Sequence, residues 1–567
     1  MRELAQALMP HLMVAPVLLP LLAACLLMLV SERRHRTKAT LGLLATAANL
    51  VVAVLLVFWV KAEDGPSAFG IYLPSNWDVP YGIALVLDRL SALMLVMTAL
   101  VALMALLFAL ARWHKAGAHF HPLFQIQIMG LNGAFLTGDL FNLFVFFEVM
   151  LAASYGLLLH GSGPARVKAG LHYIAINLAA SSLFLVGAAL IYGISGTLNM
   201  ADLAARMAEV ADADRALLHA GCAILGVAFL AKAAMWPLNF WLVPAYASAS
   251  APSAAVFALL TKVGVYVLLR LSTLLFSDDA GDSAGFGSQW LLWGGLATLT
   301  LGAIGMMSAQ RPARLAGFAV IVSSGTLMAV FGLARPEVTA GALYYLPVST
   351  FAVAAFFLLT ELMDRSRQSE GMREQAPEDE EDHLPFSMAE LELAQGTNLD
   401  EDEVPLVGRA IPAATALLGL AFICCTLLLA GLPPFSGFIG KFAMLSTLLD
   451  APGGTVAPVS WLLLGAIISS GLLALLALTR TGMRFFWAPV DRPAPVLRVV
   501  EYLPIALLIA LCVLFTVRAE AVMRYTSATA AALYQPRLYI DAVMSARPLP
   551  TPTNADRLGV PVPGGVK

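Results

Sequence analysis

The sequence predicts an all-α, polytopic membrane protein with about fourteen transmembrane helices. Of its 567 residues, 59% are hydrophobic and only 13% are charged, whereas an ordinary soluble domain carries about 25% charged residues. The mean hydropathy is +0.81, and a soluble protein of this size could not bury so much apolar surface. These observations exclude a water-soluble enzyme and a disordered chain, and the net charge of −3 provides no basic field for nucleic acid.

Long apolar runs predict the individual spans, because about 20 apolar residues cross the hydrocarbon core as a helix. The runs are too long for barrel strands, and only helices or closed barrels satisfy their backbone in lipid. The first run continues past Cys25 and precedes its basic cluster, so we expect an uncleaved helix rather than a signal peptide. The fourteen runs lie at 4–30, 39–60, 86–111, 120–138, 139–160, 168–196, 217–244, 251–274, 288–309, 313–334, 338–362, 409–449, 458–479 and 501–518.

The distribution of lysine and arginine between the loops predicts the orientation. The first, third, fifth, ninth and thirteenth loops are basic, and several even-numbered loops carry mostly acids. With an even number of spans, both termini then lie outside the cytoplasm of a cell (inner) membrane. The acidic loop 364–408 is cytoplasmic by this count, and we interpret it as a solvated linker or, alternatively, as a docking segment for a partner.

The sequence shows no motif of cofactor, metal or nucleotide chemistry. All five cysteines lie inside apolar runs, where they are expected to be small buried residues rather than metal ligands or disulfides. We therefore predict no cofactor, no metal and no enzymatic chemistry for this chain itself.

Four ionisable residues interrupt apolar runs: Glu148, Lys232, Lys262 and Lys441. Each costs at least a few kcal/mol at the centre of a bilayer. A static ion pair that holds two helices together is the alternative for any one of them, but three lysines and one glutamate cannot neutralise each other. A buried lysine without a carboxylate gives up its proton more readily as its neighbours move. The set predicts a proton relay.

Prolines beside two of these lysines predict interrupted helices. Pro237 comes five residues after Lys232, and Pro434 comes seven residues before Lys441. Proline has no N–H for the preceding turn, which leaves carbonyl groups without helical partners at Ala233, Leu429 and Ala430. With Pro433, these breaks predict that helices seven and twelve are discontinuous, as in transporters with inverted repeats. Superposing spans four to eight on spans nine to thirteen would give the two lysines corresponding places.

Three further features of the sequence are less specific. Asp139, at the border of spans four and five, is a candidate for the entrance of a proton or cation path. His172, near the start of span six, is a candidate relay group, although a hydrogen-bonded structural histidine is the simpler reading. The pair Asp88-Arg89 at the start of span three is interpreted as an interfacial anchor.

These residues stand in segments that resemble the D-type subunits of Mrp-type (Pha or Mnh) multisubunit monovalent cation/proton antiporters. The resemblance extends from about residue 80 to 480 and includes the antiporter-like subunits of respiratory complex I and of membrane-bound hydrogenases. It depends on long motifs in the same order, at 138–155, 193–203, 232–244, 261–266 and 431–441.

The resemblance implies a fold of fourteen helices with two inverted five-helix repeats, and a role for each buried charge. Glu148 corresponds to the glutamate of helix five, Lys232 to the lysine coupled to it, Lys262 to a connecting lysine and Lys441 to an exit-side lysine. Many relatives carry a histidine in helix eight, but residues 254–260 contain none. The relay would there depend on Lys262, on Thr261 or on water.

The resemblance also implies a division of the chain and a set of partners. We expect a proton-translocating subunit that exchanges H⁺ for Na⁺ or K⁺ in a lipid bilayer, together with an A-type chain and small membrane subunits of a Mrp complex. The alternatives are a proton-pumping subunit of complex I or of a hydrogenase, and a structural scaffold. The expected parts are helices 1–3 at 1–119, the first repeat at 120–276, the second repeat at 277–363 and 409–486 around the acidic loop 364–408, and helix 14 with the tail at 487–567.

Overall fold

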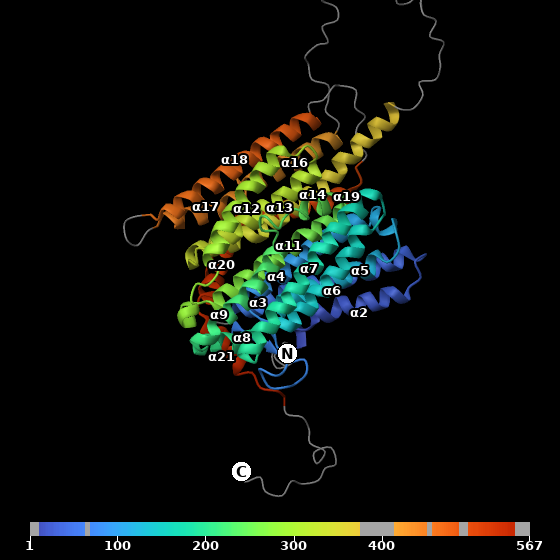
Figure 1. Ribbon diagram of the computed structural model, residues 1–567. Helices are drawn as coiled ribbons and strands as arrows, with labels where there is room; N and C mark the ends of the chain where they lie inside the picture. Colours follow the sequence, from blue (N-terminus) through green and yellow to red (C-terminus); the bar gives the residue numbers. More distant parts are fainter. Residues whose placement is uncertain (1–10, 63–67, 375–412, 451–455, 487–496, 550–567) are drawn as a thin grey trace, which may run out of the picture.

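The computed structural model describes residues 11–62, 68–374, 413–450, 456–486 and 497–549. The chain forms a bundle of long, roughly parallel helices with a single small hairpin of strands β1 (Gly70–Tyr72) and β2 (Leu85–Leu87) in the described part (Figure 1). The acidic runs at 378–382 and 400–403 lie outside the described residues.

The first half of the bundle follows the predicted spans one to eight. Its helices are α2 (Ala15–Leu29), α3 (His35–Ala62), α4 (Arg89–Ala109), α5 (Phe120–Leu136), α6 (Leu140–Leu159), α7 (Pro164–Ser195), α8 (Met200–Arg206), α9 (Asp212–Lys232), α10 (Leu242–Ser248) and α11 (Ala251–Leu275). The seventh predicted span is divided between α9 and α10, and the chain between them contains Pro237.

The second half follows the remaining spans and adds two helices. Its helices are α12 (Ser288–Ser308), α13 (Pro312–Phe331), α14 (Pro336–Glu374), α16 (Ala413–Ala430), α17 (Ser436–Leu449), α18 (Pro458–Phe486), α19 (Val499–Val517), α20 (Ala519–Leu533) and α21 (Pro536–Met544). The twelfth predicted span is divided between α16 and α17, at Pro433 and Pro434. The sequence did not lead us to expect α20 and α21.

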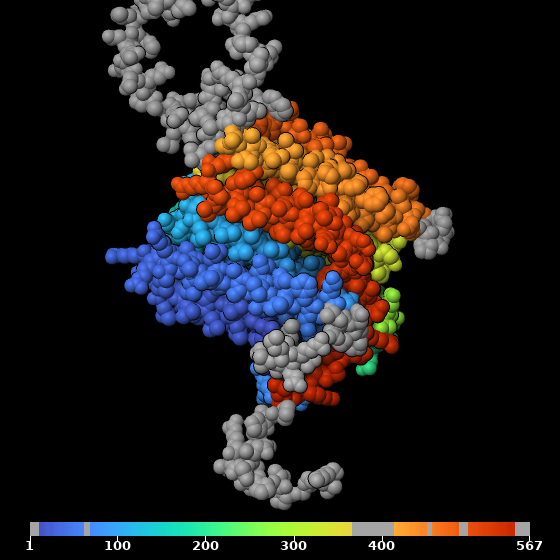
Figure 2. Space-filling model, turned by 180° about the vertical axis from the view of Figure 1, so that it is seen from behind, coloured from blue at the N-terminus to red at the C-terminus, as the bar shows by residue number. Residues whose placement is uncertain are grey.

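The described helices confirm an all-α protein that passes the membrane many times. Twelve of them are long and apolar enough to cross a membrane. The first and fourth predicted spans coincide with α2 and α5, which have 15 and 17 residues. In Figure 2, α19 in red runs along one face between the N-terminal helices in blue and α16–α18 in orange.

Segments next to several of the basic loops contact parts of the chain that are distant in sequence. Trp113 Nε1 donates to both oxygens of Glu361 at 2.8 and 2.7 Å. Arg498 donates to Ala111 O at 3.4 Å, and Arg480 to Met307 O at 2.6 Å. These contacts join residues 111–113 to Glu361 and Arg498, and Met307 to Arg480.

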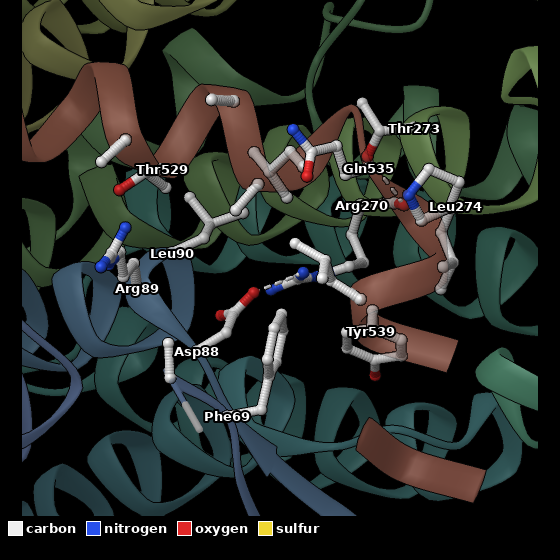
Figure 3. Close-up of a pocket in the computed structure, with 17 residues that line it drawn as sticks. Phe69, Asp88, Arg89, Leu90, Arg270, Thr273, Leu274, Thr529, Gln535 and Tyr539 are labelled. Carbon is white, nitrogen blue, oxygen red and sulfur yellow. Dashed lines mark hydrogen bonds and ion pairs between the residues drawn. The ribbon is translucent and has the colours of Figure 1, made fainter. Parts of the chain in front are cut away.

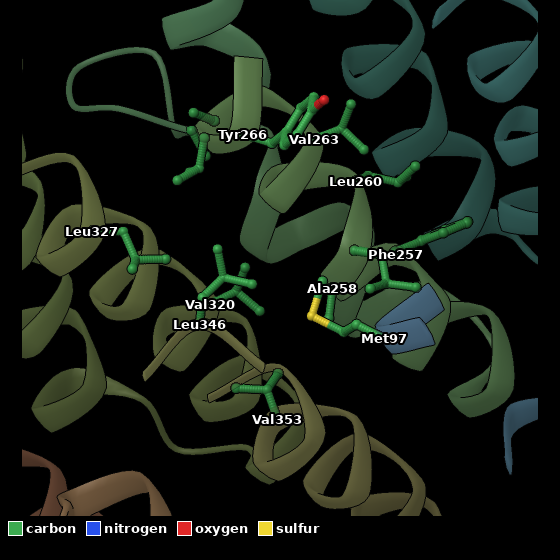
Figure 4. Packing of buried hydrophobic residues seen from close by; sticks show 14 of the residues in the cluster. Met97, Phe257, Ala258, Leu260, Val263, Tyr266, Val320, Leu327, Leu346 and Val353 are labelled. Atoms are coloured by element: carbon green, nitrogen blue, oxygen red, sulfur yellow. The ribbon is translucent and has the colours of Figure 1, made fainter. Parts of the chain in front are cut away.

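The core of the bundle centres on α11, which is buried along almost its whole length. Figure 4 shows side chains of α11, among them Phe257, in one buried cluster with residues of α4, α13 and α14 such as Met97, Val320 and Leu346. A helix that is apolar on all sides is expected at the centre of a membrane bundle. Lys262 lies in the middle of this helix, so the fold places an ionisable side chain in the buried core of the bundle.

Candidate proton-relay site

Glu148 lies on α6 and faces α7. Its side chain is half-buried, and the hydroxyl group of Ser181 on α7 donates a hydrogen bond to its Oε1. The next residue towards the N-terminus, Phe147, is fully buried. Adjacent residues on a helix point about 100° apart, so α6 presents the carboxylate to α7 and the aromatic ring to the interior.

Lys232 is the last residue of α9 and is 4% exposed. Its Nζ has no hydrogen-bond partner among the described residues and lies 4.9 Å from the centre of the Phe147 ring. Phe147 and Glu148 are consecutive, so the structure brings Lys232 to the same turn of α6 as the glutamate. Among the described residues, the Lys232 Nζ makes no hydrogen bond to the Glu148 carboxylate, which accepts from Ser181 instead. The ammonium group is instead held by the face of an aromatic ring.

The end of α9 is positioned by two neighbouring helices. A Cβ atom on Gly264 of α11 would lie 2.7 Å from Ala233 N and 3.1 Å from Lys232 C, so only glycine allows this approach. Trp236 N, in the segment before α10, donates to Thr298 Oγ1 of α12 at 2.9 Å. The interrupted segment after Lys232 is thus packed against the helix that carries Lys262.

Lys262 is 2% exposed and is held by hydroxyl groups. Its Nζ donates to Ser323 Oγ at 2.8 Å and to Ser324 Oγ at 3.4 Å, both on α13. Ser323 Oγ in turn donates to Ser349 Oγ of α14 at 2.9 Å. These groups form a short hydrogen-bonded chain through three helices, and hydroxyl groups can both donate and accept a proton.

Lys441 lies in α17 and is 6% exposed. Its Nζ donates to Ala430 O at 2.9 Å, one of the carbonyl groups that the prolines predict to be free. Gly431 and Gly471 leave the space for this side chain, since a Cβ atom on them would lie 2.5 Å from Lys441 Cδ and 3.5 Å from its Nζ, respectively. The helix break therefore supplies the oxygen that holds the third lysine.

The secondary candidates do not join these lysines in one cluster. Asp139 caps α6 and accepts from Asn142 N at 2.8 Å. Thr261 Oγ1 donates within its own helix to Ala258 O at 3.1 Å. His172 lies on the exposed face of α7, with Nδ1 3.0 Å from Lys168 O. The prolines Pro237, Pro433 and Pro434 lie in the two interruptions, next to Lys232 and ahead of Lys441.

A buried ion pair that the sequence did not reveal lies near the C-terminal end of α11. Arg270 Nη1 and Asp88 Oδ2 are 2.6 Å apart, and both residues are 6% exposed. The interpretation of Asp88 as an interfacial anchor is therefore wrong, because it pairs with Arg270 of α11 beneath the C-terminal helices. The pair borders a cavity of about 360 Å³, and the Arg270 guanidinium lies 5.3 Å from the Tyr539 ring (Figure 3). The signal that could have identified Arg270 is a charge inside the apolar run 251–274.

Comparisons with known proteins identify the family of this chain. Residues 137–376 match the family model described as NADH:quinone oxidoreductase/Mrp antiporter, transmembrane. The chain is 50% identical to the D-type subunit of a probable K(+)/H(+) antiporter of Rhizobium meliloti, over 94% of this chain and 98% of the relative. It is 31% identical to the D-type subunit of a Na(+)/H(+) antiporter of Alkalihalophilus pseudofirmus, over 94% and 100%.

A solved structure shows the same fold. A chain of the Mrp complex from Dietzia sp. superposes with a TM-score of 0.78 at 25% identity, over 94% of this chain and 100% of that chain. The identity to the two sequence relatives, over nearly the full length of each, establishes the family. The chain belongs to the family of D-type subunits of Mrp-type multisubunit monovalent cation/proton antiporters, transporters whose membrane domain is shared with NADH:quinone oxidoreductase.

Proposed function

We propose that this chain carries protons through the membrane within a Na⁺(K⁺)/H⁺ antiporter complex, along the relay Glu148, Lys232, Lys262 and Lys441. The observation that carries the proposal is the setting of the three lysines. Each is more than nine-tenths buried, and each contacts only neutral groups among the described residues. A charge that is not in direct contact with a counter-ion is costly at membrane depth, and such residues often mark an ion or proton path.

The steps of the relay follow from these contacts. Glu148 lies on the same turn of α6 as the ring that holds Lys232, so its movement relative to α9 changes the cost of charging that lysine. Lys232 then exchanges its proton, through water, with Lys262. Lys262 lies on α11, the helix that packs against the C-terminal end of α9. The hydroxyl groups of Ser323 and Ser349 lead from Lys262 into α14. Lys441 is the final carrier in the second half of the chain.

We propose K⁺ as the first cation to test. The relative named for K⁺ is 50% identical, and the one named for Na⁺ is 31% identical. Fixed ammonium groups repel metal cations, so we place the cation path outside the lysine relay, in this chain or in a partner. The expected partners are an A-type chain and small membrane subunits of the same complex.

The proposed architecture has fourteen spans, with residues 120–276 and residues 277–363 plus 409–486 as inverted repeats. Residues 1–119 and 487–567 flank them, and both termini lie outside the cytoplasm of the cell (inner) membrane. The two helix interruptions support it, because α9 ends at Lys232 and α16 ends ahead of Lys441. The acidic loop 364–408 stays an expected linker or docking segment.

The test is antiport in everted vesicles that contain the whole complex. We expect Glu148→Gln and Lys232→Ala to lower K⁺-dependent dissipation of the proton gradient at least tenfold, which corresponds to about 1.4 kcal/mol in the barrier. Lys168→Ala is the matched control, because that lysine lies exposed on α7. Full antiport by both relay variants in an assembled complex would disprove the mechanism, and a response to Na⁺ alone would disprove the proposed cation.

A further inference from the structure

A column of buried polar side chains runs between α3 and α5, on helices that the lysine relay does not use. Each member is at most 3% exposed, and α3 is long and apolar enough to cross a membrane. The members are Lys38, Thr46 and Asn49 on α3, and His121, Gln125 and Asn132 on α5. Eleven residues separate the first and last member on each helix, which corresponds to about 16 Å, or half of the hydrocarbon core.

The middle of the column is a cross-link between the two helices. Gln125 Nε2 donates to Gly42 O at 3.1 Å and to Thr46 Oγ1 at 2.9 Å. Gly42 also leaves room for the imidazole of His121, since a Cβ atom there would lie 3.2 Å from His121 Nδ1. The two helices therefore present polar groups to each other at successive turns.

The inner end of the column involves α2. Asn132 Nδ2 donates to Pro16 O at 2.8 Å, a carbonyl that has no helical partner because Pro20 four residues later has no N–H. The same amide lies 3.5 Å from Asn49 Oδ1. Three helices thus meet around polar groups at the depth of Asn49 and Asn132.

Many polar atoms of the column have no hydrogen-bond partner among the described residues. They are Asn49 Nδ2, both ring nitrogens of His121, Gln125 Oε1 and Asn132 Oδ1. Lipid tails cannot satisfy such groups, and native structures rarely leave them unpaired. The set contains donors as well as acceptors. A bare cation would need oxygens alone, whereas water both donates and accepts, so the chemistry of the column matches water.

Charged groups stand at one end of the column and apolar groups at the other. At the end on the predicted cytoplasmic face, Glu32 Oε1 lies 2.6 Å from Lys38 Nζ and 3.1 Å from His119 Nδ1. Beyond Asn49 the buried face of α3 continues with Ala53, Leu56 and Val60, which pack with Leu95, Ala99 and Leu136 of the neighbouring helices. The polar column therefore adjoins charged groups at one end and apolar packing at the other.

We propose that α2, α3 and α5 enclose a hydrated half-channel, in which a chain of water extends from the Glu32 end to the depth of Asn49 and Asn132 and exchanges protons with His121. His121 is its titratable group, and the charged and titratable side chains nearest to it are Lys38, Glu32, His114 and His35. Protons pass from water to the imidazole and back to water, with no other chemical step. This inference stands independently of the lysine relay.

The first test is X-ray hydroxyl-radical footprinting of the unmodified complex in lipid nanodiscs, which labels side chains beside water. We expect His121 to be modified at a rate within threefold of exposed His119. Phe124 is the internal control, because it is 0% exposed on the same helix and its ring also reacts readily with radicals. Protection of His121 equal to that of Phe124 would overturn the half-channel.

The second test compares Thr46→Cys with Ala53→Cys, two positions on the buried face of α3. Ag⁺ added to the face with the basic loops should block the thiol of Thr46→Cys at least tenfold faster than the thiol of Ala53→Cys. After unfolding, the thiols that Ag⁺ has not blocked are labelled with maleimide, and mass spectrometry measures the labelled fraction of each peptide. Equal rates in assembled complexes would contradict the proposal. If Thr46→Cys does not assemble, the footprinting of the unmodified protein decides. Neither readout requires transport, so failure here is distinct from failure of the relay.

Discussion

The three buried lysines differ in the group that holds each ammonium. Lys232 lies over an aromatic ring, Lys262 donates to hydroxyl groups, and Lys441 donates to a carbonyl oxygen. Neutral partners stabilise a charge less than a carboxylate does. At the scale of single residues, the arrangement suits proton exchange better than a permanent ion pair would.

The hydroxyl contacts of Lys262 make a prediction for two neighbouring serines. Ser323→Ala removes the bond of 2.8 Å and the link to Ser349, whereas Ser324→Ala removes a contact of 3.4 Å. A hydrogen bond to a charged group contributes about 1.5–3 kcal/mol, so Ser323→Ala should lower antiport about tenfold and Ser324→Ala by much less. Initial rates in vesicles measure both. Equal effects of the two variants would show that Lys262 does not depend on the Ser323 hydroxyl.

At the scale of elements, the two interrupted spans have the same physical origin. Proline removes a backbone donor and stops the helix, and a glycine on the neighbouring helix then allows close approach to the exposed backbone. Gly264 of α11 meets the end of α9, and Gly471 of α18 meets the end of α16. In each half of the chain, a small residue on an adjacent helix positions the break beside a lysine.

Gly471→Ala tests the interruption before Lys441. The new Cβ atom would lie 2.7 Å from Ala430 O and 3.5 Å from Lys441 Nζ, so the oxygen that holds the lysine must shift. We expect a loss of about 1–3 kcal/mol in stability and a marked loss of antiport. Gly465→Ala on the same helix meets nothing within 4 Å and should be neutral. Thermal unfolding and vesicle assays compare the pair, and tolerance of both substitutions would refute this packing argument.

Gly264→Ala tests the interruption after Lys232 in the same way. Its Cβ atom would lie 2.7 Å from Ala233 N, whereas the Cβ atom of Gly226→Ala on α9 would meet nothing within 4 Å. We predict that Gly264→Ala impairs antiport and lowers the melting temperature, and that Gly226→Ala retains both. If Gly264→Ala left the rate unchanged, the contact between α11 and the break would have no role in the relay.

At the scale of the whole molecule, the C-terminal helices close the end of the bundle that carries Asp88 and Arg270. Tyr525 of α20 donates to Arg89 O at 2.7 Å, and Tyr539 of α21 lies against Arg270. The buried ion pair therefore joins α4 and α11 beneath helices that come last in the chain. We therefore interpret the pair as a structural contact between these helices.

Removing one partner of this pair should destabilise the protein more than removing both. Arg270→Met leaves Asp88 as an unpaired buried charge, which costs about 3–5 kcal/mol. The double variant Asp88→Asn/Arg270→Met keeps the N-cap side chain of α4 and removes both charges, so we expect it to be more stable than the Arg270→Met single variant. Melting temperatures of the purified complex give the comparison. A double variant less stable than either single variant would contradict the assignment.

The sequence by itself determined the features that depend on local physics. Apolar run length located the spans, the prolines located both interruptions, and the charges within the runs identified Lys232, Lys262 and Lys441 as buried. Each of these follows from the cost of placing a backbone group or a charge in lipid, which is the same whatever the neighbouring helix is.

Only the tertiary structure decided which groups face each other. The serines that hold Lys262, the partnership of Asp88 with Arg270, and the polar column between α3 and α5 join residues of different helices. Hydropathy along the chain reports whether a segment enters the membrane but not which side of it meets which neighbour, because helix rotation and packing are set by contacts distant in sequence. The same limit explains why α20 and α21, whose mixed composition resembles a tail, were recognised only where they pack over the end of the bundle.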